Sequence, residues 1–388
     1  MNSLAKFLRF MSIYGLRRTI YKSAGRSRRL AKLLGPSPAT TRDVGTLGCG
    51  QFAFATVGCI LCKQAGNRFA DCFDPDTRAR DSFAEFYRIG SPSPCAADLI
   101  ARTDIELVYI ISNHASHCDY AVAALATGKR VYIEKPVAVT EEQAVRLFGA
   151  IRQDPSRAFV GYNRPHSAAI RWIHEKSSGL CGPLTLTCTV LGHVLGPDHW
   201  YRIPAEGTRI CGNVGHWIDL AIHIFAWDAM PEWVEVTIAY SSPLSCDDDL
   251  AIMISTPRGD LVTIVITSRG EPFEGINETI VFQRGDLIAK IDDFRTMHWW
   301  MGESKGRQRY FPKDVGHVRA IMQPYCGHSR NWPEVEVSTM LMLRITDMVR
   351  TGATRKRFAI HSGDQSTDVS SVVREVAQQP FSIERKSP

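Results

Sequence analysis

The chain has 388 residues, of which 44% are hydrophobic and 22% are charged. This is the composition of an ordinary globular protein, and the length fits two domains of common size. The net charge of +6 is placed unevenly, because residues 1–42 carry ten Lys or Arg and no acid, whereas the remainder carries 36 bases against 40 acids. The slightly acidic body gives no support for nucleic-acid binding, and no such partner is expected.

The cysteines and the first residues indicate where the protein resides. The eleven cysteines are scattered, and the start of the chain lacks an uninterrupted apolar core with a small-residue cleavage site. We therefore expect a reducing, cytoplasmic setting. Cys59 and Cys62 form a C-x-x-C inside an apolar, helix-like run, which favours two small hydrophobic residues over a redox pair. No metal site is expected.

Residues 1–42 are predicted to form a basic amphipathic arm. Four apolar residues recur at the i, i+3, i+4, i+7 spacing of one helical face, namely Leu4, Phe7, Leu8 and Met11. The segment is too interrupted by charge to span a bilayer. Two interpretations stay open: the arm contacts a membrane surface or a partner, or it packs on the protein's own body or on a second subunit.

Residues 43–162 are predicted to form a dinucleotide-binding domain, because strand-like and helix-like runs alternate there. Strands are expected at 43–47, 69–73, 107–111, 130–133 and about 159–161. Helices are expected at 52–65, 77–87 and 117–127. This alternation predicts an α/β fold with a doubly wound parallel sheet of the Rossmann type.

Beyond Asn163 the pattern changes, and residues 163–351 are predicted to form a substrate-binding and oligomerisation domain. Strand-like runs separated by turn signals are expected at 184–190, 232–240, 250–255, 261–267, 278–283 and 287–291. Helices are expected at 168–176, 214–225 and 335–349. This predicts an α+β domain with a mostly antiparallel sheet, followed at 352–388 by a polar, irregular tail.

The turn G-C-G-Q-F-A after the first predicted strand fits the G-x-G-x-x-G/A pattern of a dinucleotide site. Gly48 permits the tight turn, and Gly50 lets a pyrophosphate approach backbone N–H groups at a helix N-terminus. Gln51 and Phe52, which continue this turn, are expected to belong to the cofactor site as well.

Asp74 follows the second predicted strand, where a carboxylate accepts hydrogen bonds from an adenosine ribose. The alternative is a turn residue before Pro75. A carboxylate at this place repels a 2′-phosphate, so NAD is the expected cofactor. NADP stays an alternative because Arg78 and Arg80 lie nearby in the sequence.

Three stretches of sequence point jointly to one family. They are I-I-S-N-H-A-S-H-C-D-Y-A-V-A-A-L-A-T-G-K-R-V-Y-I-E-K-P at 110–136, V-G-Y-N-R-P-H-S at 160–167 and D-H-W-Y-R-I-P-A-E-G-T-R-I-C-G-N-V-G-H-W-I-D-L at 198–220. From about residue 43 to 327 the chain resembles the glucose/fructose oxidoreductase, inositol dehydrogenase and rhizopine-catabolism (Gfo/Idh/MocA) family. The arm and the tail lie outside the resemblance.

The resemblance implies a nicotinamide site at the carboxyl ends of the parallel strands. The residues it places there are Ser112, Asn113, His114, His117, Glu134, Lys135 and Asn163. The tripeptide Glu134-Lys135-Pro136 is similar to the family's hallmark, in which the lysine holds the reacting oxygen beside the nicotinamide. An ammonium group there stabilises developing alkoxide charge. A helix-capping or core-edge role stays open for His114 or His117 taken alone.

His216 lies in the H-W-I-D run, which resembles the family's second catalytic motif, and imidazole exchanges a hydroxyl proton near neutral pH. Asp219 lies three residues on, where it would orient His216 or bind a substrate hydroxyl. Further substrate contacts are expected from Asn213, Arg164, Trp200 and Tyr201. Many family members carry an aspartate four residues before this histidine, where this chain has Gly212. That departure bears on the substrate or on catalysis itself.

These features predict an NAD(P)-dependent oxidoreductase that transfers hydride between a nicotinamide and a hydroxyl carbon of a sugar, polyol or nucleotide sugar. His216 would take the hydroxyl proton while Lys135 steadies the oxygen. A homo-oligomer is expected, located in the cytoplasm, and peripheral contact at the inner membrane surface belongs to one of the two interpretations left open for the arm. The alternative from another class is a non-catalytic dinucleotide-binding sensor or partner protein on the same fold.

Overall fold

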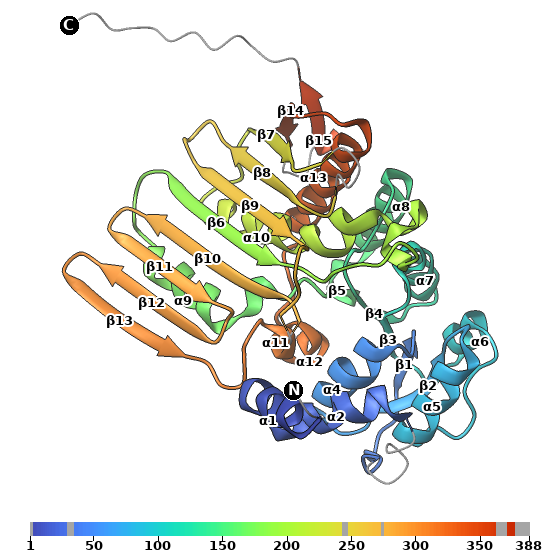
Figure 1. The fold of residues 1–388 in the computed structure, drawn as a ribbon. Helices are drawn as coiled ribbons and strands as arrows, with labels where there is room; N and C mark the ends of the chain where they lie inside the picture. The colour runs from blue at the N-terminus through green and yellow to red at the C-terminus, as the bar shows by residue number, and fades with distance from the viewer. Residues whose placement is uncertain (1–2, 29–34, 243–246, 273–274, 362–370, 377–388) are drawn as a thin grey trace, which may run out of the picture.

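The computed structural model describes residues 3–28, 35–242, 247–272, 275–361 and 371–376 (Figure 1). Two β-sheets organise this part of the chain, one with five strands and one with ten. In Figure 1 the five-stranded sheet lies at the lower right, beside the N-terminal helices, and the ten-stranded sheet extends toward the upper left.

The five-stranded sheet is parallel throughout and has the strand order β2-β1-β3-β4-β5. Its strands are β1 (Val44–Leu47), β2 (Phe69–Phe73), β3 (Leu107–Ile110), β4 (Arg130–Ile133) and β5 (Ala158–Val160). Every residue of β1 and β3 is buried, as expected for strands that helices cover on both faces. The predicted doubly wound parallel sheet is confirmed.

Helices connect these strands. The glycine turn leads into a π-helical turn, Ala53–Val57, which continues as α4 (Gly58–Gln64). The others are α5 (Thr77–Tyr87), α6 (Ala96–Ala101), α7 (His117–Ala126) and α8 (Glu141–Gln153). Helices α6 and α8 were not predicted from the sequence. Helix α8 nevertheless begins after a capping residue, since the Thr140 hydroxyl accepts a hydrogen bond from the Gln143 N–H at 3.2 Å.

The ten-stranded sheet has the order β13-β12-β11-β10-β6-β9-β8-β7-β14-β15, and all neighbouring pairs are antiparallel except β6 and β9. Its first eight strands are β6 (Leu184–Leu191), β7 (Trp233–Tyr240), β8 (Leu250–Ser255), β9 (Leu261–Thr267), β10 (Asn277–Arg284), β11 (Leu287–Asp292), β12 (Thr296–Met301) and β13 (Ser304–Arg309). Three helices cover one face (Figure 1), namely α9 (Ala168–Ser177), α10 (Gly215–Phe225) and α13 (Trp332–Thr351). The mostly antiparallel α+β prediction is confirmed.

The prediction of an irregular tail from residue 352 onward is wrong for two segments. Arg355–Ile360 forms β14, which pairs with β7, and Val373–Val376 forms β15 at the sheet edge. Phe358 and Ile360 of β14 are buried against the sheet's helical layer, so burial of a few apolar residues outweighs the charged character of the segment. Residues 362–370 and 377–388 of the predicted tail lie outside the described residues.

The N-terminal arm folds into α1 (Ser3–Tyr14) and α2 (Leu16–Arg26). Helix α2 packs on the five-stranded half, where Tyr21 meets Phe86 edge-on with ring centres 5.5 Å apart. The Lys313 N–H donates to the Ile13 carbonyl at 2.9 Å, which ties α1 to the segment before the short helix α11 (His317–Ile321). Helix α2 therefore packs on the protein's own body, as one of the two interpretations of the arm expected.

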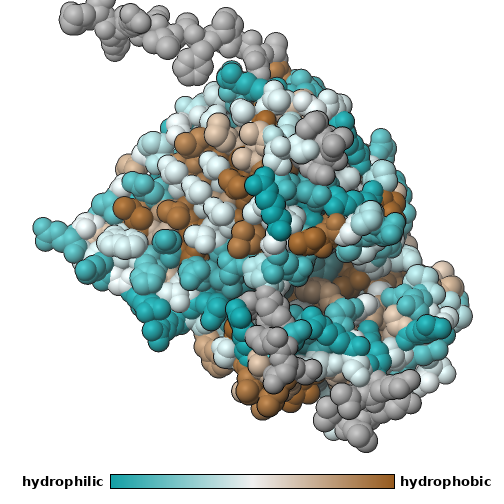
Figure 2. Space-filling model, in the orientation of Figure 1, coloured by the Kyte–Doolittle hydropathy of each residue, from teal (hydrophilic) through white to brown (hydrophobic). Residues whose placement is uncertain are grey.

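The opposite side of α1 faces solvent. Leu4 is 65% exposed and Leu8 49% exposed, and Phe7 and Met11 are half-buried, so the predicted apolar stripe lies on the outer surface. Figure 2 shows this hydrophobic patch at the lower edge of the molecule, over α1. None of the helices in the described ranges combines the length and the apolar run that a membrane crossing requires.

Candidate active site

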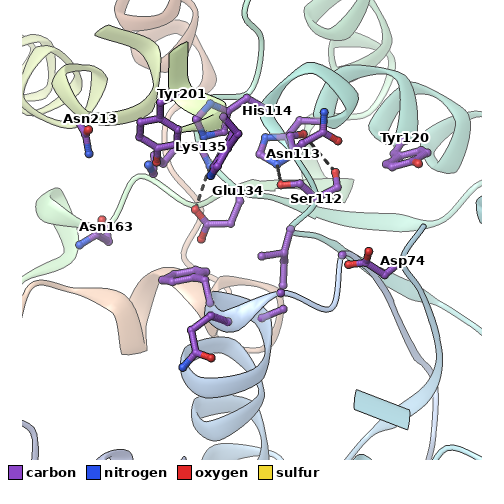
Figure 3. Close-up of a pocket in the computed structure, with 18 of the residues that line it drawn as sticks. Asp74, Ser112, Asn113, His114, Tyr120, Glu134, Lys135, Asn163, Tyr201 and Asn213 are labelled. Carbon is purple, nitrogen blue, oxygen red and sulfur yellow. Dashed lines mark hydrogen bonds between the residues drawn. The ribbon is translucent and has the colours of Figure 1, made fainter. Parts of the chain in front are cut away.

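A cavity of about 690 Å³ lies at the carboxyl ends of the parallel strands, where α/β sheets bind ligands. Residues from both halves of the chain line it. In Figure 3, Asp74 and Tyr120 lie at one end and Tyr201 and Asn213 at the other, with Lys135 between them. The cavity therefore joins the predicted dinucleotide turn to the predicted catalytic residues.

The glycine turn forms one wall of this cavity. Gly48 has a φ of +100°, and a Cβ there would lie 2.3 Å from the Ile111 carbonyl oxygen, so only glycine fits. Nothing lies within 4 Å of the position that a Cβ of Gly50 would take. A ligand can therefore approach this backbone closely at the start of a helix, whose N–H groups and dipole favour an anion. This arrangement fits the pyrophosphate of a dinucleotide.

The Asp74 carboxylate is half-buried at the end of β2 and lines the same cavity. One of its oxygens accepts the Cys49 N–H at 2.7 Å, and the other accepts the Asp76 N–H at 2.9 Å. Asp74 thus fixes the glycine turn to the end of β2. A carboxylate has about four acceptor positions, so two bonds leave capacity for a ribose hydroxyl.

The segment after β3 is held by Glu206, which belongs to the other half of the chain. The Glu206 carboxylate accepts the Asn113 side-chain amide at 2.7 Å and the Ala115 N–H at 3.1 Å. His114 Nδ1 donates to the Glu206 carbonyl at 3.0 Å, because a carbonyl can only accept. Burial, and then the nearby Lys135 charge, hold the pKa of His114 well below its usual value, so the ring is neutral with its proton on Nδ1.

His117 joins two loops. Its Nδ1 lies 2.8 Å from the Pro136 carbonyl oxygen, and its Nε2 lies 3.1 Å from the Ser112 carbonyl oxygen. Whichever nitrogen carries a proton therefore donates to one of these loops. His117 is buried and links the segment after β3 to the segment after β4, a structural role in addition to its position at the cavity wall.

Lys135 directly follows β4. Its Nζ donates to the Gly212 carbonyl at 2.6 Å, and its backbone N–H donates to the Glu134 carboxylate at 3.1 Å. Tyr132 holds the other Glu134 oxygen at 2.9 Å. Burial lowers the pKa of Lys135 to about 8, against the opposing effect of the Glu134 charge. The ammonium group is thus fixed in direction at the cavity wall.

His216 and Asn213 line the cavity opposite the glycine turn. The chain makes a π-helical turn at Ile210–Val214 before α10 begins, which places His216 in the first turn of that helix. Burial, reinforced by the charges of Arg164 and Lys135, holds the pKa of His216 well below its usual value. Within the described part of the chain, His216 Nδ1 has no hydrogen-bond partner. The imidazole is therefore neutral near pH 7.

Aromatic rings occupy the space beside Gly212. A Cβ on Gly212 would lie 2.7 Å from the Tyr201 ring and 3.0 Å from the His114 ring. The His114 ring centre in turn lies 4.5 Å from that of Trp200 and 5.0 Å from that of Tyr201. A side chain at position 212 would therefore displace the rings that form this end of the cavity.

Comparison with known proteins assigns the first half of the chain to one family. A family model, GFO_IDH_MocA, described as an oxidoreductase family with an NAD-binding Rossmann fold, matches residues 42–162. Residues 42–162 therefore form a Rossmann domain of the Gfo/Idh/MocA oxidoreductase family. The resemblance inferred from the three sequence stretches is confirmed, and with it the expectation of an NAD-binding Rossmann domain.

Relatives in the Gfo/Idh/MocA family include inositol 2-dehydrogenase of Ralstonia nicotianae, which is 27% identical over 267 residues covering 65% of this chain and 74% of the relative. Levoglucosan dehydrogenase in complex with NADH has a TM-score of 0.65 at 16% identity, covering 81% of this chain and 97% of that one. UDP-N-acetylglucosamine 3-dehydrogenase of Acidithiobacillus ferrooxidans has a TM-score of 0.64 at 17% identity, covering 81% and 98%. At these identities the two structures show a shared fold.

Two of the residues predicted from the family motifs do not reach the cavity. Asp219 is 0% exposed, and its oxygens accept hydrogen bonds from Arg330 at 2.7 and 3.1 Å and from Ser338 at 3.0 Å. The prediction that Asp219 orients His216 or binds substrate is therefore wrong, because a buried ion pair uses its carboxylate. Arg164 is likewise buried in a two-bond pair with Glu278 at 2.8 and 3.0 Å, so its predicted substrate contact is also wrong.

The other predicted site residues lie at the cavity wall. They are Gly48, Gly50, Gln51, Phe52, Asp74, Ser112, Asn113, His114, His117, Glu134, Lys135, Asn163, Trp200, Tyr201, Asn213 and His216. The Asn163 side-chain amide donates to the Val315 carbonyl, which fixes the end of β5 against the second half. The roles of these residues stay predictions, since their position alone assigns no chemistry.

Sequence reasoning missed several wall residues and one residue that supports them. The missed wall residues include Tyr120, His193, Ile276 and His317, and the supporting residue is Glu206. Tyr120 and Glu206 lie inside the quoted motifs, but no local pattern distinguishes them from ordinary surface residues. Among the residues that the structure describes, no group of three or more His, Cys, Asp or Glu side chains is arranged to hold a metal ion.

Proposed function

We propose that the protein is an NAD(P)-dependent dehydrogenase that transfers hydride between the nicotinamide and a hydroxyl carbon of a sugar, polyol or nucleotide sugar. One observation carries this proposal, namely that a single cavity joins the glycine turn to Lys135 and His216. The names inositol 2-dehydrogenase, levoglucosan dehydrogenase and UDP-N-acetylglucosamine 3-dehydrogenase among the relatives and structural neighbours support a polyhydroxylated substrate.

The nicotinamide, when bound, supplies the hydride acceptor or donor. His216, a neutral imidazole, takes the proton of the reacting hydroxyl. Lys135 uses one N–H to bind the Gly212 carbonyl, and its remaining donors hold the substrate oxygen and stabilise developing negative charge. Gly212 therefore acts through its backbone, by aiming the ammonium group.

The remaining assignments follow from position. Gly48, Gly50, Gln51 and Phe52 bind the pyrophosphate, and Asp74 accepts hydrogen bonds from the adenosine ribose, which favours NAD over NADP. Ser112, Asn113, His114 and His117 surround the nicotinamide side, with Glu134 and Asn163 supporting it. Asn213, Trp200 and Tyr201 contact the substrate, and aromatic rings suit the apolar face of a sugar ring.

The test is turnover of NAD with a panel of polyols, sugars and nucleotide sugars, followed by the absorbance of NADH. The expected result is that at least one polyhydroxylated compound reduces NAD and that removal of Lys135 abolishes this reaction. Tight binding of NADH without turnover of any panel member would favour the alternative, a dinucleotide-binding sensor on the same fold.

A cytoplasmic homo-oligomer belongs to the same proposal. The outer face of the ten-stranded sheet exposes large apolar side chains, namely Met253, Leu261, Ile288 and Trp300. Exposed apolar surface of this kind supports association with a second copy. Sedimentation velocity of the purified chain measures the oligomeric state, and a monomer at micromolar concentration would contradict it.

Peripheral contact with the inner membrane surface is also proposed, through the outer side of α1. Exposed Leu4 and Leu8 lie on an arm that carries ten cations and no acid in the first 42 residues. Each basic residue held near an acidic membrane contributes roughly 1 kcal/mol. Leu4→Asp/Leu8→Asp should reduce sedimentation with anionic vesicles at low salt, whereas Val145→Asp, at an exposed valine of α8, should not. No binding by the parent protein at low salt would reject the proposal.

A further inference from the structure

A second cavity of about 340 Å³ lies between the N-terminal arm and the glycine turn. We call it the arm pocket. It is lined by Phe10, Tyr14, Arg18 and Lys22 of the arm, by Gln51, Phe52, Ala55 and Thr56 of the helix after the glycine turn, and by His193. Gln51, Phe52 and His193 line the main cavity as well, so the two cavities adjoin.

The arm is held firmly in this position. The Gln51 side-chain amide donates to the Lys22 carbonyl at 3.3 Å, and a Cβ on Gly25 would lie 2.8 Å from the same side chain, so α2 approaches the turn as closely as glycine allows. Arg28 donates to the Cys49 carbonyl at 3.1 Å, with its guanidinium 4.0 Å from the centre of the Phe54 ring. The arm pocket is therefore a built feature of the fold.

The wall of the arm pocket is positive and aromatic. Among the described residues that line it, Arg18 and Lys22 are charged and none carries a carboxylate. Lys22 Nζ lies 3.9 Å from the centre of the Phe10 ring, and the Arg18 guanidinium lies 5.1 Å from that of Tyr14. Glu271, the acid that acts on Lys22, is itself bonded to His193 Nδ1 at 2.5 Å. Burial and the neighbouring cations Arg26 and Arg18 lower the pKa of Lys22 to about 8.

Two cations without a carboxylate between them form a site for an anion, and a phosphoryl group is the anion that Arg and Lys bind best. The proposed substrate carries hydroxyl groups at its reacting end, in the main cavity. His193 borders both cavities, and the segment that follows it supplies Trp200 and Tyr201 to the main cavity. An elongated substrate can therefore extend from one cavity into the other.

We propose that the arm pocket binds the phosphate or diphosphate of a phosphorylated sugar, with Arg18 and Lys22 as its ligands and the sugar end in the main cavity. This inference rests on the proposed dehydrogenase function and narrows its substrate to an anionic one. A nucleotide sugar gains further contact from the Phe10 and Tyr14 rings, because a base stacks on aromatic side chains. A simple sugar phosphate lacks that contact.

The test is calorimetric titration of the full-length chain, saturated with NADH, with inorganic pyrophosphate, glucose 1-phosphate, UDP-glucose and myo-inositol. The parent protein should bind pyrophosphate and both phosphorylated sugars, and UDP-glucose should bind more tightly than glucose 1-phosphate if the substrate is a nucleotide sugar. Arg18→Gln/Lys22→Gln should weaken binding of all three phosphorylated probes at least tenfold and leave myo-inositol unchanged. The matched control is Lys6→Gln, which removes an arm cation outside the pocket and should change binding less than twofold.

Two outcomes would overturn the proposal. One is pyrophosphate binding that is absent in the parent or equal in parent and double variant. The other is an equal loss of NADH affinity in the double variant, measured by fluorescence titration, because the cations would then serve the cofactor. A cooperative thermal unfolding transition is used to check that each variant is folded. If the double variant is not folded, the single variant Lys22→Gln is titrated in its place. Failure of the proposed dehydrogenase function would show separately, as phosphate binding without any turnover of NAD.

Discussion

Lys135 Nζ donates a hydrogen bond of 2.6 Å to the Gly212 carbonyl, so a backbone group directs the proposed catalytic ammonium. A Cβ on Gly212 would lie 2.7 Å from the Tyr201 ring. We expect Gly212→Ala to displace that ring and lower kcat/KM at least about tenfold. Tyr201→Ala removes the ring that the new methyl group would contact. The decrease in kcat/KM of the double variant should therefore be smaller than the two single decreases combined. A double-mutant cycle on kcat/KM measures this coupling, and strictly additive losses would contradict the contact.

Lys135→Ala should lower turnover by at least about a hundredfold, the usual scale for losing a charge partner of the transition state. The dissociation constant for NADH should stay within a few fold, because the glycine turn and Asp74 are untouched. Single-turnover kinetics and NADH fluorescence titration measure the two effects. Lys176→Ala is the control, since Lys176 lies at the surface in an ion pair with the neighbouring exposed Glu175. Equal turnover in Lys135→Ala and parent would refute the assignment.

The pH dependence of alcohol oxidation should reflect Lys135. The reaction needs a neutral His216, whose pKa is well below its usual value, and a charged Lys135, whose pKa is lowered to about 8. Both forms are present near pH 7, so kcat/KM should be level there and fall as the pH rises through about 8. In Lys135→Arg the side chain stays charged above pH 8. The decrease in kcat/KM between pH 7 and 9 should therefore disappear in this variant, even if its kcat/KM is lower at every pH. A parent profile that rises through pH 8 would contradict the role of the ammonium.

Asp74→Ala should weaken NAD binding and reduce discrimination against NADP, because it removes the repelling charge. It also leaves the Cys49 N–H without its acceptor. Asp74→Asn separates the two effects, since an amide oxygen still accepts from Cys49 but carries no charge. Both dissociation constants are measured for each variant, with the exposed Asp81→Ala as control. An unchanged NADP-to-NAD ratio in Asp74→Asn would show that Asp74 does not select the cofactor.

We expect Asp219→Ala to lower the free energy of unfolding and to leave kcat almost unchanged. Removing one partner of a buried ion pair costs about 3–5 kcal/mol, because the buried Arg330 loses its two-bond partner and keeps the longer contact with Glu334 at 3.5 Å. Asp119→Ala breaks the exposed pair with Arg146 and should cost less than about 1 kcal/mol. Urea unfolding measures both, and kcat of folded Asp219→Ala should stay within a few fold of the parent. Unchanged stability with lost turnover would restore a catalytic role for Asp219.

The strands of the five-stranded sheet could be predicted because helices cover both faces, so that each strand is a short apolar run. Leu107–Ile110 and Arg130–Ile133 are examples. Strand β13 was missed because Ser304–Arg309 lies at a sheet edge and its residues are polar or glycine. Strand β14 was missed because its buried Phe358 and Ile360 lie among charged residues. Such strands owe their structure to a neighbouring strand, which local patterns do not contain.

The same limit applies to the site. Lys135 and His216 were placed correctly at the cavity because each sits in a motif whose neighbours build its turn. Asp219 was misplaced because the i, i+3 spacing identifies a helical face but not what packs against it, and its partner Arg330 lies far along the chain. Glu206 was missed for the same reason, since its partners Asn113 and Ala115 belong to the other half.

The hydrogen bond between the Ile13 carbonyl and the Lys313 N–H has a consequence for synthesis on the ribosome. The chain emerges from its N-terminus, and the strands of the parallel sheet are complete once Val160 has emerged. The bond from Ile13 to Lys313 can form only after Lys313 has also been synthesised, and contacts so distant in sequence form slowly. The contact between α1 and the segment before α11 is therefore among the last to form, whereas α1 can pack on α2 much earlier, as in the contact of Lys22 with the Phe10 ring.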